Sequence, residues 1–175
     1  HAWPVSIAGA ALTAALTVSM WLLEPDNRLV EMIPVNNESY QALKHCDRHF
    51  GGSLSAFVTV DWPEEMDVAA PEVLDGLREV HRLIEETPEL NHPVSVLSLL
   101  ESLPGVGTDL GQRAPLLAAV PADVTRRYLR TDLRRAMVIS RLPDMGTAKL
   151  QPVFGGLDSR LAKLHERFPQ LKFKL

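Results

Sequence analysis

The chain has a single cysteine, Cys46, among 175 residues. One thiol provides no disulfide framework, so the small disulfide-stapled secreted folds are excluded, and Cys46 does not contradict an external location. A chain of this length suits one globular domain plus an additional segment.

A dense basic patch is also missing. The formal net charge is −4, and the richest basic stretch is TRRYLRTDLRR, residues 125–135, with five arginines and one aspartate. We interpret this stretch as a solvated helix face, with a contact to phosphate or lipid headgroups as the alternative. Nucleic acid is therefore not a predicted partner.

Charged side chains are absent altogether from Ala2 to Leu23, AWPVSIAGAALTAALTVSMWLL. As a helix this run spans roughly 33 Å, against about 30 Å for the hydrocarbon core of a bilayer. Trp3 and Trp21 stand near its two ends, where amphipathic rings favour the headgroup level. The run predicts a transmembrane helix over residues 2–23, with Trp3 and Trp21 as membrane-interface anchors.

Two other interpretations of this run are weaker. A secretory signal peptide needs a basic segment at its start and a small-residue cleavage site near Leu22, and the run has neither. A buried core helix rarely stays free of charge for six turns. The missing Met and the opening directly on a span favour a fragment of a longer membrane protein.

The flank that follows the span favours one orientation. Glu24, Asp26, Arg28 and Glu31 are net acidic, whereas cytoplasmic flanks are usually rich in Lys and Arg. We therefore expect residues 24–175 to lie on the extracytoplasmic, or periplasmic, side of the cell (inner) membrane.

Residues 24–52 are predicted to form a connector with a short helix over 36–52. Asn36 or Asn37 is its expected N-cap, and Gly51 takes the left-handed position after its last turn. The glycine pair in HFGGSLSAFVTVDW, residues 49–62, thus ends a helix before an alternating strand begins.

The remaining residues, 53–175, alternate between strand and helix patterns. Strands are predicted near 53–62, 93–98, 134–142 and 170–175, and amphipathic helices near 71–87 and 147–168. The first long helix begins at Pro71 and carries the apolar stripe Val73, Leu74, Leu77, Val80 and Ile84. Residues 101–132 are treated as an insertion with two short helices around Pro121.

This order of elements is that of the split βαβ, ferredoxin-like α+β fold. Right-handed crossovers place both long helices on one face of a four-stranded antiparallel sheet, with the first and third strands central. Phe57, Met137 and Ile139 then point to the other face. We expect that face to pack on a partner domain, since it would otherwise be exposed.

The motif most typical of a metal site is HCDRH, with His45, Cys46 and His49. On a helix His45 and His49 share a face, but Cys46 points about 100° away, and no fourth ligand cluster is visible. We interpret the motif as a solvated helix end, and predict neither a metal nor a cofactor.

Other residues that could act in catalysis or ligand binding lack the surrounding sequence motifs that such sites require. No serine lies in a GxSxG motif, and the glycine clusters at 51–52 and 105–107 are too short for a phosphate-binding loop. His81 and His165 lie in helical stripes and are interpreted as core-edge histidines. We find no catalytic constellation, which favours a transport or recognition element over an enzyme.

Several short stretches occur in a recognisable order. IP precedes the short helix, FGG precedes the first strand, HPVSVLSLLESLPG contains the second strand, and LPDMG follows the third. With the preceding span, this order resembles the resistance-nodulation-division (RND) superfamily of exporters, particularly its lipid-exporting, MMPL-like branch. The resemblance covers nearly the whole chain and depends on order and spacing, since no single motif is highly specific.

In that family, the first helix of each half is followed by an extracytoplasmic porter domain of ferredoxin-like subdomains. The resemblance implies a fragment of a proton-coupled exporter of hydrophobic molecules. Its partners would be the remaining domains of the transporter, membrane lipids and the hydrophobic substrate. Residues 2–23 contain no ionisable side chain, so no proton-relay residue is carried over. The alternative is a membrane-anchored extracytoplasmic sensor or recognition domain, or the periplasmic domain of an ABC-type transporter.

Overall fold

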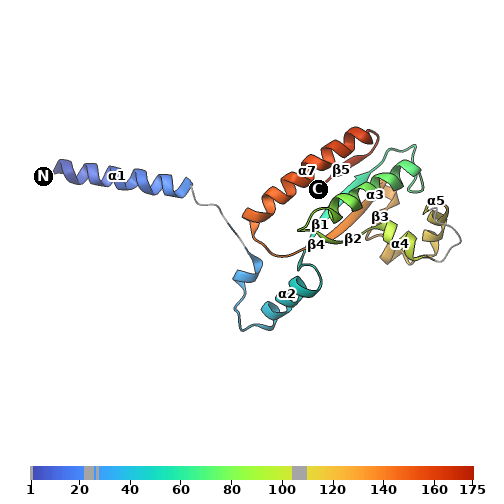
Figure 1. Cartoon of the computed structure of the whole chain (residues 1–175), viewed down its shortest axis with the longest axis horizontal. Coiled ribbons are helices and arrows are strands. Elements are labelled where there is room, and N and C mark those ends of the chain that lie inside the picture. The colour runs from blue at the N-terminus through green and yellow to red at the C-terminus, as the bar shows by residue number, and fades with distance from the viewer. Residues whose placement is uncertain (1, 22–25, 27, 104–109) are drawn as a thin grey trace.

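The computed structural model describes residues 2–21, 26, 28–103 and 110–175. The chain has an α+β architecture: an N-terminal apolar helix, α1 (Ala2–Trp21), precedes a connector and an open antiparallel sheet with covering helices (Figure 1). The connector contains a 3₁₀ turn (Leu29–Met32) and α2 (Glu38–His49). Residues 22 and 23 of the predicted span lie outside the described residues.

The sheet has the strand order β2-β4-β1-β5, with every neighbouring pair antiparallel. β1 (Leu54–Asp61) and β4 (Arg135–Leu142) are central, as predicted, and pair along their full length. β2 (Asn91–Val94) and β5 (Lys172–Lys174) lie outside them. The prediction of four strands was wrong by one, because the two-residue β3 (Leu129–Arg130) also pairs with β4.

The core lies between this sheet and two long helices, α3 (Pro71–Glu85) and α7 (Thr147–Arg167), which Figure 1 shows on the same side of the strands. Alternate residues of β1 are buried, namely Ala56, Val58 and Val60, as are their neighbours in β4. All five residues of the predicted α3 stripe are buried, and Leu77 is fully enclosed. The buried residues of α7 lie only in its second half, at Leu157, Leu161 and Leu164.

The predicted strand over residues 93–98 was wrong in its second part. β2 ends at Val94, and α4 (Val96–Ser102) begins two residues later. The Ser95 hydroxyl accepts the N–H of Leu97 at 3.1 Å, and the Ser98 hydroxyl accepts the N–H of Ser95 at 3.4 Å. This reciprocal cap starts a helix where the β-branched residues favoured a strand.

The insertion contains more short elements than predicted. α5 (Leu110–Arg113) and a 3₁₀ helix (Ala114–Ala119) precede Pro121, and α6 (Ala122–Thr125) follows it. The prediction of a basic helix face over residues 125–135 was wrong. α6 ends at Thr125, and the arginines lie on the turn after it, on β3, directly after a further 3₁₀ turn (Thr131–Leu133) and at the start of β4. Residues 105–107, with the GVG sequence, lie outside the described residues.

Candidate functional site

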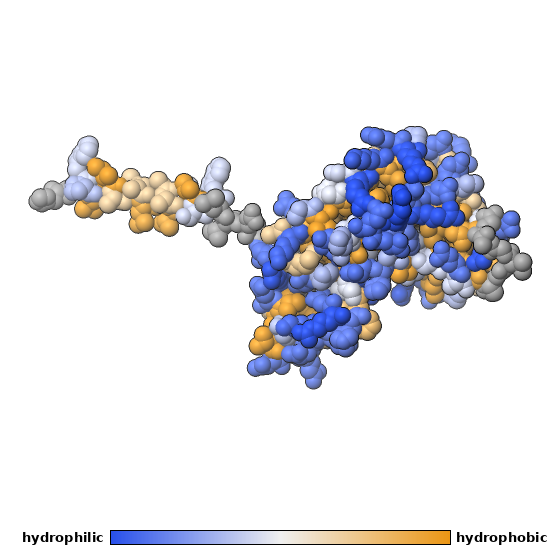
Figure 2. All heavy atoms as spheres, viewed as in Figure 1, coloured by the Kyte–Doolittle hydropathy of each residue, from blue (hydrophilic) through white to orange (hydrophobic). Residues whose placement is uncertain are grey.

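Helix α1 presents an apolar surface all round. Its segment Trp3–Trp21 is long and apolar enough to cross a membrane, and none of it is buried against the rest of the described chain. In Figure 2 this helix is orange to pale with no strongly hydrophilic residue, unlike the largely hydrophilic body. The rings of Trp3 and Trp21 are 80% and 87% exposed near its ends, about 27 Å apart along a helix axis.

The polar side chains of α1 bond within the helix. The hydroxyls of Thr13, Thr17 and Ser19 each donate to the backbone carbonyl four residues earlier, at 2.8–2.9 Å. A hydroxyl satisfied in this way needs no water, which is the condition for placing it in a hydrocarbon environment.

The sheet face opposite the helices is open, as predicted. Phe57 is 49% exposed, and Met137 and Ile139 are half-buried on the same face. In the pairing register, Ile139 lies opposite both Phe57 and Val94, so an apolar row crosses β1, β4 and β2. Sheet faces with this apolar content are typical of interfaces.

Charged side chains lie beside this apolar row, at the C-terminal end of β1. Arg135 donates two hydrogen bonds to the Asp61 carboxylate, from Nε at 2.5 Å and Nη2 at 2.9 Å, and Lys174 Nζ lies 3.6 Å from it. The hydrogen bond from Arg135 lowers the pKa of Asp61, against a smaller opposing effect of burial. With Lys172, Arg141 and Arg130, the strand residues of this face carry five basic groups and one acidic group, although the whole chain has net charge −4.

Two of the motifs that carry the family resemblance meet in space. Gly51 has φ +76°, the left-handed position expected of it, and its carbonyl accepts a hydrogen bond from the Asn91 side chain at 3.0 Å. Gly52 has φ +143° and lies so close to Leu142 and Pro143 that a Cβ there would be 2.1 Å from the Leu142 carbonyl. The FGG sequence thus packs directly against the start of the LPDMG sequence.

The rest of LPDMG contacts the connector. Asp144 accepts a hydrogen bond from the backbone N–H of Val30 at 2.9 Å. On the connector side, Asp26 accepts the N–H of Ala148, in the first turn of α7, at 3.4 Å, and lies against Gly146. These contacts join residues more than 110 positions apart and attach the chain just beyond α1 to the sheet and α7.

The HCDRH motif lies at the end of α2. The His45 and His49 rings stack at 4.2 Å, Phe50 approaches His45 edge-on, and the Cys46 thiol is free and half-buried. Across the described ranges, no group of three or more His, Cys, Asp or Glu side chains is placed to hold a metal ion.

The histidines interpreted as core-edge residues have structural partners. His81 Nε2 lies 2.6 Å from the buried Ser95 hydroxyl, and burial lowers the pKa of His81. His165 Nδ1 lies 2.6 Å from the Leu171 carbonyl. The sequence did not predict that Asp26 and Asp144 bind distant backbone N–H groups. The LPDMG motif contains Asp144, but nothing in it indicates that Val30 is the partner.

Comparisons with protein-family models, with curated proteins and with solved structures found no match to this chain.

Proposed function

We propose that the chain is one membrane span and one extracytoplasmic subdomain of an RND-type, MMPL-like exporter of hydrophobic molecules. One observation carries the proposal: a sheet of order β2-β4-β1-β5, covered on a single face, follows an apolar helix of membrane-spanning length. We assign the sheet and its two long helices to the ferredoxin-like split βαβ fold, for which that order and the antiparallel pairing are required.

The open sheet face supports a role within a larger assembly. Its apolar row of Phe57, Ile139 and Val94 is too exposed to serve a core function, and its charges are mainly basic. We infer that it packs on another domain of the same transporter, whose surface has an apolar centre and an acidic border. Such packing lets two subdomains move against each other around a hydrophobic cargo.

The single cysteine allows a direct test of the proposed orientation. Intact cells expressing the protein are treated with a membrane-impermeant maleimide, with Cys46→Ser as the unlabelled control. Because Cys46 is only partly exposed, a second variant, Cys46→Ser with Ser159→Cys, places the thiol at an exposed position of α7. Labelling of either thiol in intact cells supports the proposal, and labelling only after the membrane is opened refutes it.

Export is tested in the full-length parent protein by proton-gradient-dependent efflux of a hydrophobic dye. Phe57→Asp places a charge in the apolar row, and Leu116→Asp makes the same change at an exposed apolar residue of the insertion. We expect efflux to fall with Phe57→Asp and to persist with Leu116→Asp. A parent protein that moves no dye but alters a cytoplasmic signal would instead be a sensor.

A further inference from the structure

A groove lies between the turn that follows α3 and the first half of α7. Its volume is about 640 Å³, within the range of small-molecule sites. Four of its lining residues, Ala148, Pro152, Gly156 and Arg160, are spaced four apart on α7 and form an inclined row that extends about 18 Å along the helix axis. Met145, Val153 and Leu157 add apolar surface beside this row, and Figure 2 shows apolar colour over this half of α7.

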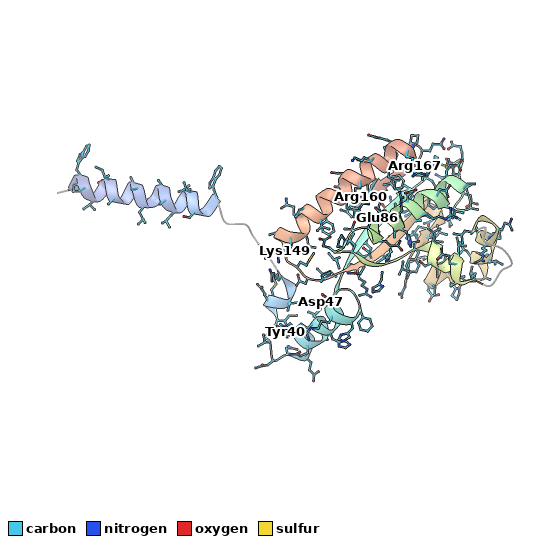
Figure 3. The ribbon with its side chains drawn as sticks, viewed as in Figure 1. Tyr40, Asp47, Glu86, Lys149, Arg160 and Arg167 are labelled. Carbon is cyan, nitrogen blue, oxygen red and sulfur yellow. The ribbon has the colours of Figure 1, made fainter. Side chains whose placement is uncertain are left out.

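Arg160 lies at one end of the groove, where its charge is neutralised. Arg160 donates to the Leu83 carbonyl and the Thr87 hydroxyl, both at 3.3 Å, and forms an ion pair with Glu86. These three partners hold the guanidinium in place, and Figure 3 shows Arg160 and Glu86 adjacent. A charged ligand would therefore gain little electrostatic stabilisation at this end of the groove.

The other end of the groove carries a free cation. Lys149 is exposed in the first turns of α7, and within the described part of the chain no ion pair involves it. Figure 3 places it at the opposite end of the row from Arg160. Two carboxylates lie near Lys149 or in the lining: Asp26, which pairs with Arg28 at 3.3 Å, and Glu89, which is half-buried on the α3 side. Lys149 is the exposed basic group at this end.

The Lys149 end lies close to the proposed membrane surface. Asp26 accepts the N–H of Ala148, next to Lys149, and only four residues separate Asp26 from Trp21 at the end of α1. At about 3.6 Å per residue, the Cα atoms of Trp21 and Asp26 are at most about 18 Å apart. The groove therefore begins within reach of the headgroup region in which Trp21 would lie.

We propose that this groove binds a single-chain anionic amphiphile, with its alkyl chain along the Ala148–Arg160 row and its headgroup at Lys149. The row is one helix face wide and ends at Arg160, so it suits one chain. This proposal rests on the proposed function only in requiring that α1 spans the bilayer.

The test uses the whole chain in nanodiscs of a neutral lipid and a palmitic acid that carries a photoreactive diazirine. Labelled peptides are mapped by mass spectrometry. We expect label within residues 145–160, above any label in α1. Gly156→Leu fills the groove from a position where an added Cβ meets nothing within 4 Å, and we expect it to reduce this label about tenfold.

Two matched control variants distinguish an effect on the groove from a general effect on helix α7. Gly155→Leu makes the same change one residue away, at an exposed position outside the lining, and should keep the label. Lys149→Glu should reduce labelling by the fatty acid about fivefold and leave labelling by an uncharged diazirine alcohol unchanged, whereas Lys163→Glu should change neither.

Several outcomes overturn the proposal. The site is excluded if Gly156→Leu leaves the labelling unchanged or if anionic and cationic probes label equally. Label confined to α1 also excludes it. Displacement of the probe by an apolar peptide but not by unlabelled palmitate would assign the groove to a protein segment. A chain that fails to insert into the nanodisc contradicts the proposed function instead, which distinguishes the two failures.

Discussion

Replacing Gly52 with alanine tests the contact at which the glycine pair meets the end of β4. At φ +143° an L-residue is strained by about 1–3 kcal/mol. The added Cβ would also lie 2.1 Å from the Leu142 carbonyl carbon and oxygen and 2.6 Å from the Pro143 nitrogen. These are backbone atoms that cannot rotate away, so the first β1–β4 pair, Leu54 with Leu142, must separate.

Relieving this overlap costs about a further 1–3 kcal/mol, the usual range for overpacking, which gives a total of about 2–6 kcal/mol. The free energy of unfolding of a typical domain is about 5–15 kcal/mol, so the substitution would remove a large part of it. The control, Gly155→Ala, adds a Cβ to an exposed helical glycine with nothing within 4 Å and should stabilise by about 0.5–1 kcal/mol.

The measurement is urea unfolding of the whole chain in detergent micelles, followed by circular dichroism. With a slope of about 1–3 kcal/mol per molar urea, Gly52→Ala should lower the midpoint by about 1 M or more, and Gly155→Ala should raise it slightly. A Gly52→Ala midpoint equal to that of the unmodified chain would refute both the backbone conformation and the contact.

Three further predictions concern the core, the thiol and the buried histidine. Leu77→Ala should lower the free energy of unfolding by about 2–5 kcal/mol in the same assay, because Leu77 is fully buried; a loss below about 1 kcal/mol would contradict its place in the core. Cys46→Ser, or an added chelator, should change the free energy of unfolding by less than about 0.5 kcal/mol, since the thiol is free; unfolding by chelator would reveal a metal-built domain. Burial lowers the pKa of His81 in the folded state, so its contribution to stability is complete above the unfolded pKa of about 6.5 and is lost as the pH falls below it. His81→Gln should flatten that decline between pH 7.5 and 5, and an unchanged pH profile would assign the decline to other groups.

Local patterns determined much of this protein. The uncharged run is a property of consecutive residues, and it predicted α1 without reference to any other segment. The alternation of Ala56, Val58 and Val60 and the stripe on α3 follow from the strand and helix periods, so their buried faces were also predictable. With right-handed crossovers, the order of these elements was enough to predict that β1 and β4 are central and that one face stays open.

The tertiary structure decided what depends on distant partners. No local signal paired Asp26 with the α7 backbone or Gly52 with Leu142, because nothing in a sequence records which of the many distant residues a side chain meets. The same holds for the groove beside α7, whose two walls come from segments about 60 residues apart. At Ser95 the local patterns competed, and the cap that its hydroxyl forms within a buried site favoured helix over strand. Hydrophobic periodicity therefore determines which face of an element is buried, whereas packing determines which surfaces and charges come together to form a site.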